Sequence, residues 1–315
     1  MSSKLLPFAV ILLLAACDGA ALVGSSGEGT DGETDGGGDG VSGEVPAALA
    51  VNMHSFAYDG TSLEVAIEGG DSNPELVQYD RAAALDLPGY SAYSIQEDAL
   101  DRLYVALVAT SQDGSVTAIA AGDGGLDNRY YAGGLYHREG QFDRPEIGAN
   151  GLGGLVSYAG TYAAVTNVDA RQEGGADDIA LPVAPGTDPV VIPAQPSRVE
   201  GDIYLTADFG ADNVVSGSIY DRSLVDEGIP LPNVILVPTS INDDGTFEGG
   251  AEDEGQNAIG SYGGIFGGND AQSVGGIVHL TQFSDLYENE QEHGVFVLTQ
   301  CGPNNTLPIC DNVLP

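Results

Sequence analysis

Short runs of alternating apolar and polar residues, separated by Gly, Asp and Asn turns, make up most of the chain after residue 46. In the run 199–208, for example, Val199, Ile203 and Leu205 fall on one face, and the intervening positions are mostly polar. A period of two is typical of a β-strand that buries one face, and apolar periodicity of helical length is missing. The pattern therefore predicts an all-β protein.

Two sets of strands follow from this pattern. The first set is expected at 50–58, 63–67, 90–95, 103–110, 116–121 and 130–137. The second, more regular set is expected at 155–168, 199–208, 214–220, 234–239, 246–250, 260–266, 275–281 and 295–300. Antiparallel strands with one apolar face can close on themselves, which removes exposed sheet edges. We therefore predict a small β-rich domain over 47–150 and an eight-stranded antiparallel β-barrel over 154–300.

Glycines occur inside the predicted barrel strands, where they would normally weaken strand pairing. They are Gly201, Gly217, Gly263, Gly264, Gly275 and Gly276. Such positions suit a barrel that bends sharply or whose axis is crowded by side chains. A barrel of this size fills its interior with side chains, so we expect ligands to bind at the strand-end loops and at the junction with the first domain.

The N-terminus has the layout of a secretory signal peptide: Lys4, an apolar stretch over 5–14, and small residues before Cys17. The apolar stretch is shorter than the ~20 residues that a spanning helix needs. The sequence Leu-Ala-Ala-Cys resembles the lipobox of bacterial lipoproteins, in which the cysteine is lipidated. We predict a signal peptide over 1–16 and a lipid anchor on Cys17; the alternative is an ordinary signal peptide with a chance cysteine.

The segment 17–46 follows the predicted cleavage site and is rich in glycine and acidic residues. It holds no aromatic residue and no basic residue. Such a composition predicts a disordered linker between the lipidated cysteine and the folded part.

Charge excludes one class of partner. Without the predicted signal peptide the chain keeps eight arginines against 47 acidic residues, a net charge of −39. Nucleic-acid binding needs clustered Lys and Arg, so nucleic acid is excluded as a partner. The acidity fits a saline habitat, in which salt screens self-repulsion, and it fits equally well a simple role in solubility.

Cys301 and Cys310 are the two cysteines beyond Cys17. In an exported protein they should pair, and this predicts a disulfide-closed tail over 301–315. The alternative, a metal site, lacks a second pair of Cys or His ligands nearby in the sequence; His293 is the nearest histidine.

No catalytic motif joins the four histidines, His54, His137, His279 and His293. Catalytic partners separated in sequence can still meet in space. From the residues we predict a protein that is not an enzyme, with no catalytic, cofactor-binding or metal-binding residue and no cofactor. Several tyrosines lie near strand ends, and we expect most of them to pack in the core or at the domain junction; we assign none of them to ligand binding.

One stretch of the predicted barrel resembles a motif of transferrin-binding protein B and related surface lipoproteins of Gram-negative bacteria. The matching positions are Gly264, Phe266, Gly268, Ala271, Gly275 and Gly276, and the departures are Gly267, Asn269 and Ser273, where the family usually has Tyr, Pro and Glu. The resemblance covers about residues 154–300. It implies a smaller β-rich handle domain before the barrel. Residues 47–150 match that domain only by their position in the chain order.

The resemblance also implies an outer-membrane, cell-surface location and a binding role. The chain is long enough for one handle and one barrel, as in the smaller haem- or haemoglobin-binding relatives, so transferrin itself is not expected as the ligand. We predict a monomeric, lipid-anchored surface protein that binds a protein or a small ligand such as an iron or haem source. The alternatives are a structural envelope lipoprotein without a captured ligand and an envelope hydrolase.

Overall fold

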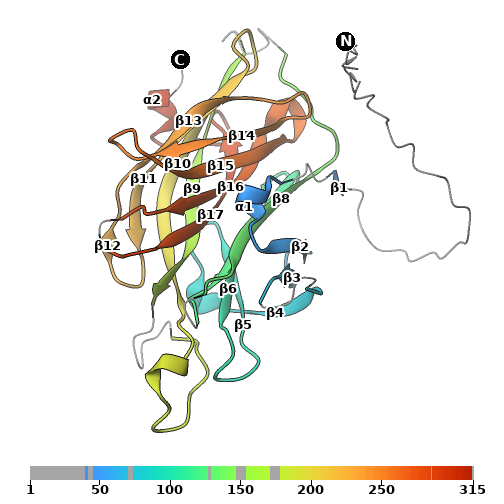
Figure 1. The fold of residues 1–315 in the computed structure, drawn as a ribbon. Coiled ribbons are helices and arrows are strands. Elements are labelled where there is room, and N and C mark those ends of the chain that lie inside the picture. The colour runs from blue at the N-terminus through green and yellow to red at the C-terminus, as the bar shows by residue number, and fades with distance from the viewer. Residues whose placement is uncertain are drawn as a thin grey trace, which may run out of the picture. The chain divides into compact units, whose positions relative to one another are not determined.

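The structure is a computed structural model, and it describes residues 40–41, 45–69, 74–126, 129–146, 154–170, 178–284 and 286–313. Residues 38–315 make up one compact unit. Strands dominate, as the alternating pattern predicts, and they form two antiparallel sheets that follow one another along the chain. Figure 1 shows the two sheets, with β2–β6 below and the red and orange strands of the second sheet above.

The first sheet, which we call the N-terminal sheet, has the strand order β1-β8-β7-β6-β5-β4-β3-β2. Its strands are β1 (Gly40–Val41), β2 (Met53–Tyr58), β3 (Leu63–Ile67), β4 (Val77–Arg81), β5 (Ser91–Ile95), β6 (Tyr104–Thr110), β7 (Val116–Asp123) and β8 (Ala132–Glu139). The sheet curls until its ends approach each other: the backbone N–H of Asn52 donates to the carbonyl of Ala132 at 3.1 Å. The N-terminal sheet is therefore nearly closed.

The second sheet is the barrel. Its strands are β9 (Leu155–Asp169), β10 (Pro196–Asp208), β11 (Val214–Leu224), β13 (Val234–Ser240), β14 (Thr246–Glu252), β15 (Ala258–Gly267), β16 (Ser273–Thr281) and β17 (Gln291–Gln300), with the two-residue β12 (Ile229–Pro230) beside β11. Each strand pairs antiparallel with its neighbours, and the pairing of β10 with β11 closes the ring. The predicted eight-stranded antiparallel barrel is confirmed.

Short helical segments complete the fold. They are α1 (Ala47–Ala50), the 3-10 turns η1 (Ala83–Leu85), η2 (Pro189–Val191) and η3 (Asn269–Ala271), and α2 (Cys310–Val313). The connection from β9 to β10, which carries η2, and the connection from β5 to β6 both run to the bottom of the view in Figure 1. The backbone N–H of Leu181 donates to the side-chain oxygen of Gln96 at 2.7 Å, which ties the two connections together.

Glycines in the barrel strands make room on both faces of the sheet. A Cβ on Gly276 would lie 2.3 Å from the Phe296 ring, so this glycine faces a crowded barrel interior, as expected. A Cβ on Gly275 would lie 2.4 Å from the Val116 side chain of β7, on the opposite face. Alternate glycines thus admit aromatic rings inside the barrel and let the N-terminal sheet approach its outside.

Three details of the N-terminal region differ from the predicted pattern. The strand expected from residue 50 begins at Met53, because Ala47–Ala50 form α1. β4 was not predicted, because its apolar and polar residues alternate only over Val77–Asp80, and Tyr79 is its single buried residue. Gly40 and Val41, which we expected to be disordered linker, pair with Glu139 and Arg138 of β8.

Candidate functional site

The interior of the N-terminal sheet is open at one end. A cavity of about 510 Å³ lies among β3, β4, β5 and β6 and the loops that follow them. Its apolar walls come mainly from Val65, Ile67, Tyr79, Ile95 and Tyr104. Pockets that bind small molecules are usually concave, apolar and several hundred Å³ in volume, with a few polar groups. We therefore take this space, the N-terminal cavity, as the candidate functional site.

Two tyrosines give the N-terminal cavity its polar groups. Tyr79 on β4 and Tyr104 on β6 are buried, and burial raises the pKa of both phenols far above the usual range, so both stay protonated. The Tyr104 hydroxyl donates to the backbone carbonyl of Glu68 at 3.3 Å. Neutral phenols next to aliphatic walls suit a ligand that is mostly apolar.

Arg102 also lines the N-terminal cavity, but its charge is already engaged. It forms an ion pair with the buried Asp123, and its guanidinium donates to the carbonyls of Leu126 at 2.9 Å and Arg129 at 3.0 Å. It also stacks on the Tyr131 ring at 4.7 Å from the ring centroid. Burial raises the pKa of Asp123, and the hydrogen bond from Arg102 opposes that rise. Arg102 therefore offers little charge to an anionic ligand.

The rim of the N-terminal cavity combines apolar and acidic residues. Val77 and Leu100 line it and are 42% and 43% exposed. Glu75, Glu97 and Asp101 line it as well. Exposed apolar groups favour an apolar ligand, and the carboxylates repel an anionic one. The lining thus fits a neutral or cationic ligand with an apolar body.

The barrel interior is filled, in contrast. Phe266, near the end of β15, packs inside the barrel with the rings of Tyr158, Phe209 and Phe247 between 5.0 and 5.5 Å from it, centroid to centroid. Such offset and tilted ring pairs are favourable contacts and leave little space. A cavity of about 210 Å³ at one barrel end, beside Arg222, has largely polar walls.

A buried polar network occupies that end of the barrel. Arg222 of β11 and Glu292 of β17 form an ion pair at 2.5 Å with both side chains fully buried. The Tyr162 hydroxyl donates to the other Glu292 oxygen at 2.7 Å, and Arg222 also donates to the carbonyl of Pro232 at 2.6 Å. The charges are therefore compensated inside the barrel, and the network holds β9, β11 and β17 together.

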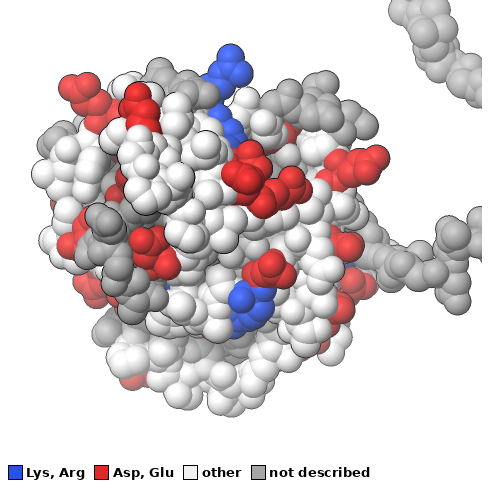
Figure 2. All heavy atoms as spheres, turned by 90° about the horizontal axis from the view of Figure 1, so that it is seen from below, with Lys and Arg blue, Asp and Glu red and all other residues white. Residues whose placement is uncertain are grey.

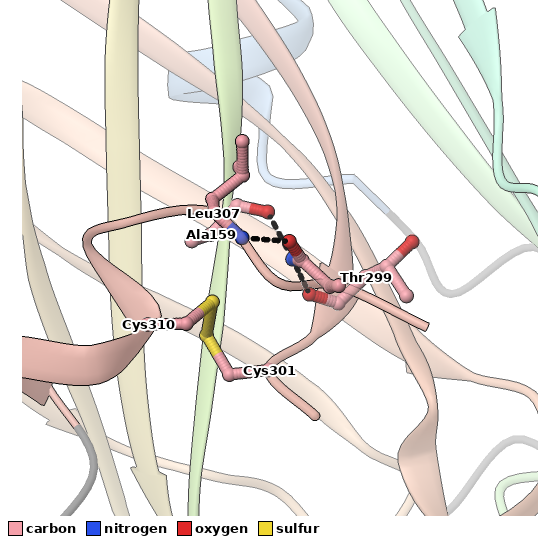
Figure 3. The surroundings of a disulfide bond; sticks show 6 residues. Ala159, Thr299, Cys301, Leu307 and Cys310 are labelled. Atoms are coloured by element: carbon pink, nitrogen blue, oxygen red, sulfur yellow. Dashed lines mark hydrogen bonds between the residues drawn. A yellow bond between two sulfur atoms is a disulfide. The ribbon is translucent and has the colours of Figure 1, made fainter. Parts of the chain in front are cut away.

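The predicted disulfide between Cys301 and Cys310 is present, with the Cα atoms 5.4 Å apart (Figure 3). The loop that it closes is held on the barrel by Asn305, whose side-chain amide donates to the carbonyls of Ala159 and Thr299, both at 2.8 Å. The disulfide thus fastens the chain after β17 to the edge formed by β9 and β17.

The other predicted positions fall in different places. Cys17 lies outside the described residues. His54 and His137 belong to β2 and β8 of the N-terminal sheet, and His279 and His293 face each other across β16 and β17, with ring centroids 4.3 Å apart. This pairing was not predicted, because His279 lies in the predicted strand 275–281 but His293 precedes the predicted strand 295–300.

Within the described residues, no group of three or more His, Cys, Asp or Glu side chains is placed to hold a metal ion. The same residues include no helix long and apolar enough to cross a membrane. Figure 2 shows one face of the molecule, on which acidic side chains outnumber basic ones. The surface therefore has the acidic character that the composition predicts.

Comparisons with known proteins give structural matches only. No family model matches the sequence, and no curated protein matches it. Similar solved structures include intact Ap-TbpB with its N and C lobes, at 16% identity and a TM-score of 0.36 over 76% of this chain and 51% of that one. They also include a TbpB double mutant from Haemophilus parasuis Hp5, at 14% identity and a TM-score of 0.37 over 76% and 50% of the two chains.

A third similar structure is isotype 1 TbpB from serogroup B Neisseria meningitidis, at 13% identity and a TM-score of 0.33 over 79% of this chain and 51% of that one. All three are structures of transferrin-binding protein B, the family whose motif the barrel sequence resembles. The chain spans about half the length of these proteins. The ligand must therefore be argued from the chain's own residues.

Proposed function

We propose that this protein is a membrane-anchored, non-catalytic binding protein that holds a small, neutral or cationic, largely apolar ligand in its N-terminal cavity. The observation that carries the proposal is the cavity of about 510 Å³ with aliphatic and tyrosine walls inside a nearly closed sheet. The exposed apolar rim residues Val77 and Leu100 give such a ligand an entrance.

The contrast with the barrel supports this assignment. The barrel interior is packed with aromatic rings, so a ligand would have to displace side chains to enter it. The N-terminal cavity needs no such displacement, since its space is already open. A preformed site costs less ordering on binding than one that must open.

Binding of the neutral apolar dye Nile red tests the proposal. The chain has no tryptophan, so Ile67→Trp both fills the N-terminal cavity and adds a fluorescent reporter at its wall. The control Ile235→Trp places the same residue on an exposed position of β13, outside the cavity. We expect Ile67→Trp to weaken dye binding by roughly tenfold or more, equivalent to about 1.4 kcal/mol, and Ile235→Trp to leave it unchanged.

Equal dye affinity in the two tryptophan variants would contradict the site. Both variants add the same apolar side chain, so nonspecific adsorption of the dye would change equally in the two. A difference in dye affinity between them therefore reports binding in the cavity. Quenching of the tryptophan emission by bound dye in the Ile67→Trp variant, with no quenching in the Ile235→Trp variant, would support binding in the cavity.

The anchor is tested separately. Cys17 carries the lipid in this proposal, so Cys17→Ser should end fatty-acid labelling and release the protein from membranes in soluble form. Tight membrane association of the Cys17→Ser protein would contradict the lipid anchor, but it would not bear on ligand binding in the N-terminal cavity. Digestion of the protein on intact cells by added protease is expected if it faces the outer surface, as the resemblance implies.

A further inference from the structure

Four buried polar atoms of the described residues lie without hydrogen-bond partners where the N-terminal sheet meets the barrel. They belong to His293 (both ring nitrogens), His279 (Nε2) and Tyr130 (the hydroxyl). Buried polar groups are nearly always paired, and each exception calls for an explanation. We call these three side chains the junction cluster.

The junction cluster joins the two sheets physically. His279 and His293 are directly opposite each other on β16 and β17, and their rings stack at 4.3 Å with an interplanar angle of 16°. Tyr130, from the segment before β8, lies with its ring centroid 5.8 Å from that of His293. A Cβ on Gly122 of β7 would come within 2.8 Å of the Tyr130 hydroxyl, so the phenol is wedged between the sheets.

The surroundings favour neutral imidazoles. His293 is fully buried, and burial lowers its pKa, as does the neighbouring His279. Burial is also the main cause that lowers the pKa of His279, and interactions with the Ala48 carbonyl and the Gln291 side chain oppose it only in part. The Nδ1 atom of His279 lies 3.0 Å from the carbonyl of Ala48 in α1 and so carries the proton, which leaves the lone pair on Nε2. Two cations stacked at this distance would repel each other strongly.

Among the described residues, no free carboxylate faces the junction cluster to compensate a new positive charge. The two whose charges reach Tyr130 are Asp123 and Glu292. Asp123 is paired with Arg102, and Glu292 points into the barrel, where it is paired with Arg222. The groups beside the cluster on β9 and β17 are Val165 and Gln291, which are neutral.

Protons can reach the junction cluster from solvent. A cleft of about 550 Å³ lies next to it, lined by Tyr130 and Gln291 together with Gly125, Asn167 and Arg129. Arg129 adds a positive charge to that opening, which further disfavours charged imidazoles. The sheets also meet through an apolar layer that includes Ala120 of β7 and Val295 of β17. Hydrogen bonds away from the junction cluster cross between them as well: Arg138 donates to the carbonyls of Asp244 and Phe266, and Ser273 donates to Asp113.

We propose that the junction cluster is an acid-sensitive latch: protonation of the stacked His279–His293 pair loosens the N-terminal sheet from the barrel. Above the ordinary histidine pKa of about 6.5 the imidazoles are neutral and the junction is closed. Below it, the imidazoles of the opened state bind protons, and those of the closed state do not, because their pKa values are lowered. The closed state therefore loses stability relative to the opened state as the pH falls from about 6.5 to the lowered pKa values.

Hydrogen exchange on the full chain tests the latch at pH 7.5 and pH 5.5, with protection factors that correct for the intrinsic pH dependence of exchange. We expect protection of the junction amides in β7, β16 and β17 to fall by roughly tenfold or more at pH 5.5. Amides of β13 and β14, on the far side of the barrel, should keep their protection. Undiminished protection of the junction at pH 5.5 would overturn the proposal.

The double variant His279→Phe/His293→Phe removes the titrating groups and keeps aromatic packing. His293→Phe removes two unpartnered buried nitrogens, which is near neutral or stabilising. His279→Phe gives up the hydrogen bond to the Ala48 carbonyl but keeps the stacked ring, so we expect the double variant to fold and to lose the pH response. His54→Gln, at an exposed position of β2, is the matched control and should keep the response. A pH response that survives in the double variant would contradict the latch.

Carbon-detected NMR titration of the histidine rings in the unaltered protein tests the latch without relying on the folding of a variant. We expect the His279 and His293 signals to stay in the neutral form below the ordinary histidine pKa of about 6.5, and then to titrate together with the loss of junction protection. Titration of either ring near pH 6.5 with the junction still closed would refute the proposal.

Discussion

The two sheets share one antiparallel construction, and each packs a hydrophobic core, but they differ in the space left beside that core. The barrel closes through β10 and β11 and fills its interior with side chains that include the rings around Phe266. The N-terminal sheet stops short of closure and keeps a cavity of about 510 Å³. Where strands close, side chains can fill the space; where they remain open at one end, volume stays available for a ligand.

The largest expected effect comes from removing the Phe266 ring from the barrel interior. Phe266→Ala should destabilise the protein by about 3–5 kcal/mol, since it leaves a void among packed rings. Ile67→Ala, in the wall of the N-terminal cavity, should cost about 1 kcal/mol, because its side chain already borders open space. Urea unfolding followed by circular dichroism measures both. Equal costs would show that the two interiors are packed alike.

A buried ion pair in each sheet allows a matched comparison. Glu292→Gln should cost about 3 kcal/mol, because it leaves the fully buried Arg222 without its counter-charge. Asp123→Asn should cost less, because Arg102 is 14% exposed and keeps two backbone carbonyls as acceptors. Chemical unfolding of both variants decides the order. If Asp123→Asn lowered the free energy of unfolding more than Glu292→Gln, the barrel ion pair would not be the one that contributes more to stability.

A somewhat smaller effect concerns the C-terminal disulfide. Reduction, or Cys301→Ser with Cys310→Ser, should lower stability by about 2.5–3 kcal/mol on the chain-entropy model for a loop of ten residues. The Asn305 hydrogen bonds to the carbonyls of Ala159 and Thr299 should weaken with it, so hydrogen exchange of the Asn305 side-chain amide should become faster. Unchanged thermal stability after reduction would mean that the loop is held by Asn305 alone.

The barrel could be predicted from the sequence because its strands follow a strict period of two. On β10, for example, Ile203, Leu205 and Ala207 are buried and the residues between them are partly exposed, as the pattern requires. Hairpin connections are short enough to fix which strand pairs with which. All eight predicted barrel strands are present, with ends shifted by a few residues.

The candidate site could not be predicted in the same way. Its walls come from β3, β4, β5 and β6, and the cavity exists because the sheet curls without closing, which alternation does not encode. β4 buries a single residue, Tyr79, so it has no row of buried positions with a period of two that would predict a strand. We expected ligands to bind at loops and at the domain junction because the barrel was predicted to be filled. The N-terminal cavity, which lies inside the other sheet, was not predicted.

The junction cluster shows a different limit. Whether His279 meets His293 depends on the register of β16 and β17, and the connection between them is long enough to allow several registers. Alternation in the predicted strand 275–281 places His279 on the outward face, but His293 precedes the predicted strand 295–300. Only the register of β16 and β17 brings the two histidines opposite each other. A one-residue slip would have put one of them inside the barrel.

Xenon bound in crystals under pressure tests the contrast between the two interiors most directly, because xenon enters apolar space that lacks side chains. We expect xenon density in the N-terminal cavity, in contact with Ile67 and Ile95, and none among the rings around Phe266. Density in the barrel interior, or an N-terminal cavity that takes up no xenon, would contradict this contrast.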